Sequence, residues 1–242
     1  MSKPDYGLDA PKLVRRFAVR GGLLIAFAII LYFTNRDSTP GAALALASIC
    51  GCIGLGFALS AGIMLWSSRV GKLKLRDRIL DSLTWRGDEN VLDVGCGRGL
   101  LLIGAAKRLK AGKATGVDVW SNQDLSGNSP EATLANAKAE NVANRVKIES
   151  ADARKLPYGA NSFDIVVSSL AIHNISSSAE RAKAIGEIVR VLKPGGQIAI
   201  FDILAAGEYA KAFRDLGLED VKLSGLSWLW SVPGRTVTAR KP

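Results

Sequence analysis

NVLDVGCGRGLLLIGAAKRL (residues 90–109) places three glycines, Gly95, Gly97 and Gly99, on alternate positions directly after a short apolar run. The apolar run is typical of a buried strand, and the residues from 100 onward favour a helix. Glycine has no Cβ, so it permits positive φ angles and lets the backbone approach a ligand closely. A strand-to-helix turn also presents free backbone N–H groups and the positive end of the helix dipole. The stretch therefore predicts a binding loop for a small polar ligand.

Strand and helix patterns alternate along the chain from this stretch onward. The strand patterns cover residues 90–94, 114–119, 145–150, 163–169 and 196–202, and the helix patterns cover 98–110, 129–143, 178–192 and 207–216. This alternation predicts an α/β fold with a doubly wound, parallel sheet. The tail breaks the pattern, because LEDVKLSGLS and GRTVTARK indicate an antiparallel hairpin at the sheet edge. The glycine loop then lies outside the carboxyl ends of the strands, where such sheets bind ligands.

Two long apolar stretches occupy the N-terminal third, at about residues 17–33 and 41–66. The second contains no charged residue and is long enough to cross a bilayer, so the pair predicts a hairpin of two transmembrane helices. Basic residues precede the first stretch and follow the second, which places both termini in the cytoplasm. The alternatives are a cleaved signal peptide, whose cleavage site would be poor here, and a pair of buried core helices, which the uncharged length disfavours.

The apolar stretches also divide the chain. We expect residues 1–70 to form an anchor in the cell membrane and residues 71–242 to form the α/β domain. A short basic link from Ser67 to Arg76 would press that domain against anionic headgroups. The formal net charge is +10. Because the basic residues bracket the apolar stretches and do not alternate with aromatic residues, they favour a membrane surface over nucleic acid as the partner.

The chemistry-bearing side chains exclude several kinds of site. Three cysteines and one histidine give neither a disulfide framework nor a metal site. A dinucleotide fingerprint would need a glycine where the chain has Leu100, and a Walker-type loop is absent. Instead, acids occur near the ends of the strand patterns: Asp93 for a cationic amine, Asp118 for ribose hydroxyls and Asp152 for an adenine amine. These three, without a phosphate cradle, describe S-adenosylmethionine (SAM).

VLDVGCGRG, GVDVW, ADARKLPY, FDIVVSSLAIHNI and VLKPGGQIAIFDI, in this order, resemble the motifs of class I SAM-dependent methyltransferases over residues 75–240. The resemblance implies a seven-stranded, mostly parallel sheet with an antiparallel final strand. It also implies a set of cofactor-binding residues. These are Asp93, Gly95, Gly97 and Gly99 around the methionine, Asp118 on the ribose, Asp152 and Ala153 on the adenine, and Ser168 beside the methyl donor.

Several of these residues have a purely structural alternative. Asp118 would otherwise stabilise its turn, and Asp152 would otherwise cap the residues that follow it. Trp120 is a candidate to cover the adenine. Trp228 and Trp230 alternate on a strand-like stretch, and we expect them to pack in the core.

His173 follows the fourth strand, near the expected methyl group, and a histidine there could take a proton from the acceptor. The alternative is a structural hydrogen bond that ties its loop to a helix. The chain has no second histidine, and no aspartate–histidine relay is apparent.

The leading hypothesis is therefore a membrane-anchored methyltransferase that uses SAM and acts on a small-molecule or lipid-like acceptor. We expect neither a metal nor a nucleic-acid partner. A second hypothesis is a non-catalytic SAM-binding sensor or assembly protein of a membrane complex. A nicotinamide-dependent oxidoreductase is third, and Leu100 argues against it. The fold does not identify the acceptor, because this class methylates many kinds of molecule.

Overall fold

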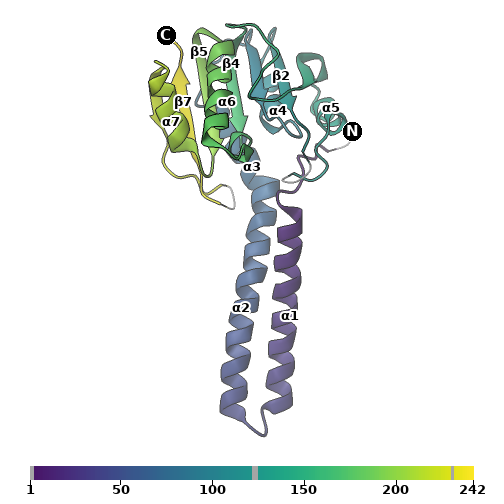
Figure 1. Cartoon of the computed structure of the whole chain (residues 1–242). Coiled ribbons are helices and arrows are strands. Elements are labelled where there is room, and N and C mark those ends of the chain that lie inside the picture. The colour runs from purple at the N-terminus through teal and green to yellow at the C-terminus, as the bar shows by residue number, and fades with distance from the viewer. Residues whose placement is uncertain (1–2, 122–124, 230–231) are drawn as a thin grey trace. The chain divides into compact units, whose positions relative to one another are not determined.

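Figure 1 shows the computed structural model, which describes residues 3–121, 125–229 and 232–242. The chain divides into two compact units. One is Leu8–Val70, and the other combines Met1–Gly7 with Gly71–Pro242. The functional division into an anchor, residues 1–70, and an α/β domain, residues 71–242, stays a prediction. The structural division adds that the first residues group with the α/β unit.

The α/β unit contains a seven-stranded sheet, as predicted. The strand order is β3-β2-β1-β4-β5-β7-β6, and β7 is antiparallel to both of its neighbours, whereas the other pairs are parallel. The order reverses at β1, which lies between β2 and β4. The strands are β1 (Asn90–Val94), β2 (Lys113–Asp118), β3 (Val146–Ser150), β4 (Phe163–Ser169), β5 (Leu192–Asp202), β6 (Glu219–Leu223) and β7 (Arg235–Arg240).

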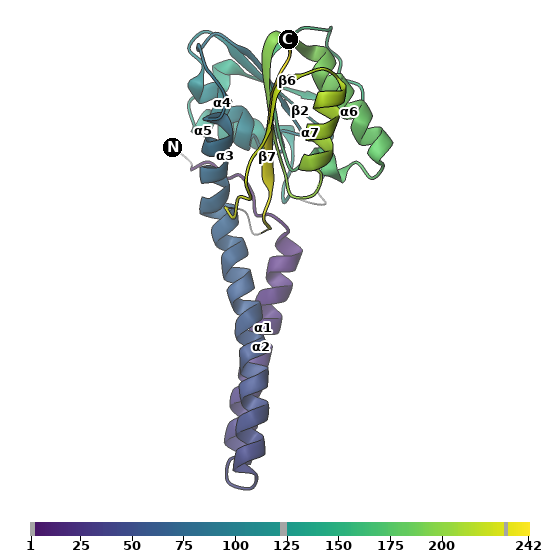
Figure 2. The ribbon, with the colours of Figure 1, turned by 90° about the vertical axis from the view of Figure 1, so that its left-hand side faces the viewer.

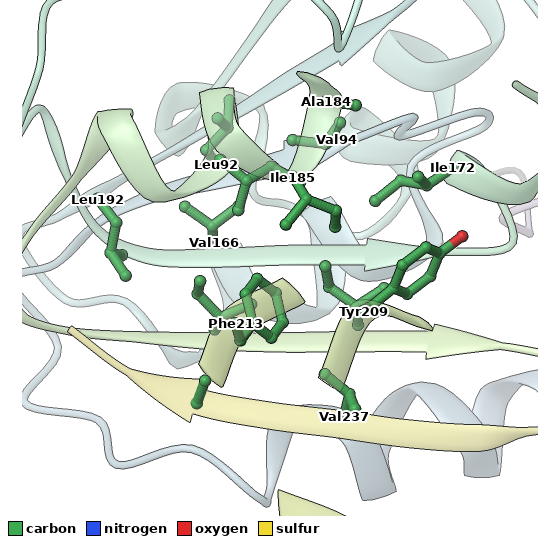
Figure 3. Close-up of a cluster of buried hydrophobic side chains, with 14 of the residues drawn as sticks. Leu92, Val94, Val166, Ile172, Ala184, Ile185, Leu192, Tyr209, Phe213 and Val237 are labelled. Carbon is green, nitrogen blue, oxygen red and sulfur yellow. The ribbon is translucent and has the colours of Figure 1, made fainter. Parts of the chain in front are cut away.

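Helices cover both faces of this sheet (Figures 1 and 2). Alternate residues of each strand point to opposite faces, so Leu92 and Val94 pack with α6 and α7, and Val91 packs with α3 and α4. Figure 3 shows the first of these clusters, in which Ile185, Tyr209 and other helix residues lie against the sheet. The helices are α3 (Lys72–Leu80), α4 (Leu100–Arg108), α5 (Pro130–Ala139), α6 (Ser178–Val191) and α7 (Ala206–Asp215).

The other unit is an antiparallel pair of helices, α1 (Pro11–Asn35) and α2 (Pro40–Trp66). Small residues bring the two backbones together: a Cβ on Gly21 would lie 2.9 Å from the carbonyl oxygen of Gly54. Both helices are long and apolar enough to cross a membrane, and only 11% of the most apolar window of each is buried. A core helix would be mostly buried, so these helices are candidate spans.

The structure adds detail to one connection and corrects an expectation about another. The short basic link from Ser67 to Arg76 forms a π-helical turn, Ser67–Gly71, and the beginning of α3, and its predicted contact with headgroups stays a prediction. Leu75 and Ile79 of α3 are buried in the core of the α/β unit. Trp228 does not pack in the core, since 69% of it is exposed. Trp230 lies outside the described residues.

Candidate functional site

The glycine loop, residues 95–99, begins where β1 ends. The backbone N–H groups of Gly95 and Cys96 both donate to the carbonyl of Val117 on β2, at 2.8 and 3.0 Å. Gly95 has a φ of +72°, and a Cβ there would lie 2.1 Å from the Cβ of Ala171. No other residue fits this position, because a side chain would meet both backbone strain and the loop after β4.

The rest of the loop is held by side chains from two other elements. The N–H of Gly97 donates to Oδ2 of Asp118 at 2.8 Å, and its carbonyl accepts from the Thr133 hydroxyl at 2.7 Å. Gly99, with a φ of +86°, precedes the first residue of α4. The loop therefore has a defined shape, set by β2 and α5 as well as by its own glycines.

Asp118, at the end of β2, stabilises its turn and also faces the loop. Its Oδ1 accepts from the backbone N–H of Trp120 at 2.6 Å and from the Asn128 amide at 3.3 Å. With the bond from Gly97, three of the roughly four acceptor positions of the carboxylate are in use. The structural role is thus present. A role in binding ribose hydroxyls stays a prediction, which the remaining acceptor position supports.

Asp93 and Ser168 are buried beneath the loop. Oδ2 of Asp93 accepts from the backbone N–H of Leu102 at 2.8 Å, and the hydroxyl of Ser168 donates to the carbonyl of Val94 at 2.7 Å. Burial raises the pKa of Asp93 to about 8, although the hydrogen bond from Leu102 opposes the shift. Both side chains position the loop and the beginning of α4. Their predicted contacts with the cofactor stay predictions.

The predicted adenine end lies at the carboxyl end of β3. Asp152 forms an ion pair with Arg154, whose hydrogen bonds lower the pKa of the Asp152 carboxyl below its usual value. Ala153 packs against the core between the sheet and α6 and α7. The indole N–H of Trp120 donates to the Ser150 hydroxyl at 2.8 Å. Asp118 and Trp120 are thereby brought to the same place as β3, as the predicted adenine and ribose contacts require.

His173 has a partner that the sequence analysis missed. It lies on a short 3-10 helix, Ile172–Asn174, and its Nδ1 is 3.2 Å from Oδ2 of Asp202, the last residue of β5. Oδ2 also accepts from the hydroxyl of Tyr209 at 2.9 Å. The expectation of no aspartate–histidine relay is wrong, because neighbouring strands bring these residues together. The signal available in the sequence was an acid at the end of a strand pattern, in IAIFDI.

The hydrogen bonds of Asp202 fix its charge. Burial raises the pKa of its carboxyl, but hydrogen bonds from His173 and from the backbone N–H groups of Leu204 and Ala205 outweigh burial, so the pKa lies below its usual value. An ionised carboxylate only accepts hydrogen bonds, so Nδ1 of His173 carries the proton. In the neutral imidazole the other ring nitrogen, Nε2, is then the acceptor.

A short N-terminal segment, which we call the strap (residues 3–7), lies against the glycine loop. The guanidinium of Arg98 donates to the carbonyl and to the carboxylate of Asp5, each at 2.8 Å. The buried Asn136 of α5 exchanges hydrogen bonds with the backbone of Asp5 and also donates to the carbonyl of Arg98. The ammonium of Lys72 donates to the carbonyls of Tyr6 and Gly7. The sequence analysis assigned no site role to these residues.

The residues around the glycine loop fit SAM. The loop has glycine where a Cβ would fill space, and Asp118 and Asp93 accept hydrogen bonds from the N–H groups of Gly97 in the loop and of Leu102 in α4. The loop lies at the reversal of strand order, where ligands of doubly wound sheets bind. Within the described residues there is no group of three or more histidines, cysteines or acids that could hold a metal ion.

Comparison with known proteins agrees with this geometry. A family described as a methyltransferase domain matches residues 92–200. A sterol 4-C-methyltransferase from Caenorhabditis elegans is 31% identical over 137 residues, which cover 57% of this chain and 38% of that protein. A demethylmenaquinone methyltransferase from Lactiplantibacillus plantarum is 32% identical over 130 residues, which cover 52% and 50%. The chain thus spans half or less of the length of these two relatives.

The solved structures show the same fold. A SAM-dependent methyltransferase from Aquifex aeolicus superposes with a TM-score of 0.57 at 19% identity, covering 76% of this chain and 98% of that one. The α/β unit therefore has the fold of class I methyltransferases. Together with the matched domain, this likeness supports SAM as the cofactor.

Proposed function

We propose that this chain is a membrane-anchored SAM-dependent methyltransferase with a lipid-soluble acceptor. The observation that carries the catalytic part is the His173–Asp202 pair at the carboxyl ends of β4 and β5. His173 follows β4, the neighbour of the strand that bears the glycine loop, and Asp202 ends β5, the next strand beyond β4. A site that only sensed SAM would need the loop and its acids, but not an oriented base beside them.

The chemistry follows from the groups present. SAM supplies an electrophilic methyl carbon, and the acceptor atom attacks it as the bond from that carbon to sulfur breaks. The domain contributes mainly alignment, which supplies much of the rate in such displacements. Nε2 of His173 takes the proton that a hydroxyl acceptor loses, and Asp202 stabilises the imidazolium that forms. Tyr209 and two backbone N–H groups hold Asp202 in place.

The acceptor class rests on two supports. The candidate spans α1 and α2 would concentrate the domain at a bilayer, where apolar molecules dissolve. Two relatives are named as enzymes of a sterol and of demethylmenaquinone, both of which are largely apolar molecules. We propose that both termini and the α/β unit face the cytoplasm, where SAM is made.

The test compares the full chain with the variant His173→Ala, both in liposomes with radiolabelled SAM and a lipid extract as the source of acceptor. We expect label in the lipid fraction, and a loss of kcat on the order of 10²–10⁴-fold in the variant, at unchanged SAM affinity. Asn174→Ala, at the exposed neighbouring position, is the matched control and should retain kcat.

Each other outcome removes a defined part of the proposal. Label that enters only water-soluble material or protein removes the lipid-soluble acceptor. SAM binding without transfer to any fraction favours a non-catalytic SAM-binding protein. Equal kcat in the wild type and in His173→Ala returns His173 to a structural role.

A further inference from the structure

Four exposed apolar side chains lie beyond the carboxyl end of β5. We call them the edge patch: Leu204 (78% exposed), Trp228 (69%), Leu226 (53%) and Val232 (46%). Leu204 follows Asp202, the last residue of β5, which pairs with Arg235, the first residue of β7. Ser227 pairs with Gly234 in the connection that leads into β7, so the other three side chains come from the same end of the sheet.

The local structure keeps these side chains out of the core. A Cβ on Gly234 would lie 2.4 Å from the ring of Phe201, so the connection already packs as closely on β5 as it can. Leu229 contributes to the core from the same segment, whereas Trp228 next to it points away. Soluble domains rarely leave a contiguous apolar patch without a partner, and such patches mark interaction sites.

The chain leaves and re-enters the α/β unit at this same end of the sheet. The strap ends at Gly7, next to Leu125 and to Arg98 of the glycine loop. The chain re-enters the α/β unit at Gly71. The ammonium of the next residue, Lys72, donates to the carbonyl of Gly7, so the chain re-enters the unit beside the place where it leaves. Only Leu8–Ala10 separate Gly7 from α1, and an extended chain covers at most about 3.6 Å per residue. The chain therefore passes from this end of the sheet into α1 through three residues, and α2 continues through Ser67–Gly71 directly into α3.

The charge next to the patch and the spans is also informative. Arg235, which pairs with Asp202, is exposed. Lys12, Arg15, Arg69 and Lys74 flank the candidate spans and are exposed as well. Basic residues attract anionic headgroups, and tryptophan prefers the interface between headgroups and acyl chains. Exposed apolar side chains and basic residues, on a unit that is joined covalently to two candidate spans, fit a lipid surface better than a soluble partner.

We propose that the edge patch inserts into the interfacial layer of an anionic bilayer, as a contact with lipid separate from the spans. The inference rests on the proposed membrane anchoring and deepens the proposed acceptor class. It does not depend on methyl transfer. Because His173 and Asp202 lie at the same end of the sheet as the patch, insertion would open the acceptor side of the site to the bilayer. An apolar acceptor would then reach the site without crossing water.

The test uses the full chain in vesicles that contain phosphatidylserine, with a polarity-sensitive NBD label on a single cysteine. Cys50 and Cys52 are replaced by serine and Cys96 by alanine, and one label site is introduced per variant: Trp228→Cys, Leu204→Cys or Leu216→Cys. Leu216 is the matched control. It is 49% exposed, but it follows α7 at the opposite end of the sheet. SAM binding by each labelled variant confirms that it is folded.

We expect the labels at positions 204 and 228 to emit at shorter wavelength in vesicles, and to be quenched by lipids that carry a spin label near the headgroup. The label at 216 should report water and should not be quenched. If the labels at 204 and 228 report water, the proposal is overturned. If they report an apolar environment that spin-labelled lipid does not quench, the patch is covered by protein, either as a lid over the acceptor or by a second copy, and the proposal is equally overturned. None of these readouts requires an active enzyme.

Discussion

Asp93 is buried beneath the glycine loop, and burial raises its pKa to about 8. The folded protein without ligand therefore holds a proton on this acid at neutral pH. By linkage, this group contributes stability that is fully present below the ordinary pKa of 3.8 and is lost as the pH rises to about 8. A cation placed next to Asp93 favours the carboxylate and lowers its pKa.

This property predicts that SAM binding releases a proton. At about pH 6.5 the amine of SAM is a cation, and its approach would displace the proton of Asp93 into the buffer. Titration calorimetry in buffers of different ionisation enthalpy measures the number released. We expect a release that approaches one proton at about pH 6.5 and falls as the pH rises through about 8, where Asp93 of the free protein ionises, and no release at about pH 6.5 in Asp93→Asn. A binding enthalpy independent of the buffer at about pH 6.5 would show that Asp93 does not meet the amine.

A comparison of two glycines distinguishes the energetic cost of backbone strain from the cost of steric crowding. Gly95 and Gly195 have nearly equal φ angles, +72° and +74°, but a Cβ on Gly95 would strike Ala171, whereas a Cβ on Gly195 would meet nothing within 4 Å. Gly195→Ala should cost only the left-handed strain, about 1–2 kcal/mol. Gly95→Ala should cost clearly more and should also weaken SAM binding, because the glycine loop or the loop that bears His173 has to move. Chemical denaturation and calorimetry measure both effects, and equal losses of stability would contradict the crowding.

At the scale of elements, the strap changes what can be removed from the chain. No cofactor motif precedes residue 90, so we expect the hairpin to be dispensable for SAM binding. The structure adds that residues before the hairpin contact the site, because Asp5 is bound by Arg98 of the glycine loop and by Asn136 of α5. A chain that begins at Val70 would lose these contacts. A variant without the hairpin should therefore keep residues 1–7, joined to Gly71 by a flexible linker.

Asn136→Ala tests the strap in the full chain. The variant leaves the backbone of Asp5 and the carbonyl of Arg98 without the amide that binds them, which should cost about 1–3 kcal/mol of unfolding free energy. It should also weaken SAM binding, because Arg98 belongs to the glycine loop. Thermal unfolding and calorimetry measure the two effects. The exposed Asn144 gives the control Asn144→Ala, which should change neither, and an Asn136→Ala protein with unchanged SAM affinity would make the strap purely structural.

At the scale of the whole molecule, the two candidate spans predict a topology. The exposed turn between α1 and α2 contains Ser38, and exposed Ser82 follows α3 in the α/β unit. With both termini in the cytoplasm, a cysteine at position 38 should react with a membrane-impermeant reagent in intact cells, and a cysteine at 82 should react only after lysis. The background again lacks Cys50, Cys52 and Cys96. Reaction at 82 in intact cells, without reaction at 38, would reverse the topology and separate the site from cytoplasmic SAM.

The glycine loop, the alternating strands and helices, and the two apolar helices could be predicted because each is written in neighbouring residues. Period and spacing determine which backbone groups are buried and which positions need glycine. The acids near the carboxyl ends of β1, β2 and β3 could be placed at one edge of the sheet for the same reason, since parallel strands end at one edge. Helix α3 was missed because its apolar residues are few and lie within a run of basic ones.

Contacts between distant residues needed the folded chain. His173 and Asp202 are 29 positions apart and meet because β4 and β5 are neighbours in the sheet. Asp5 and Asn136 are 131 positions apart and meet because the strap lies on α5. Trp228 has the same alternating pattern as a core residue, yet 69% of it is exposed in the connection that leads into β7. Local pattern determines which segments form strands and helices, whereas strand order and packing volume decide which side chains become partners and which face outward.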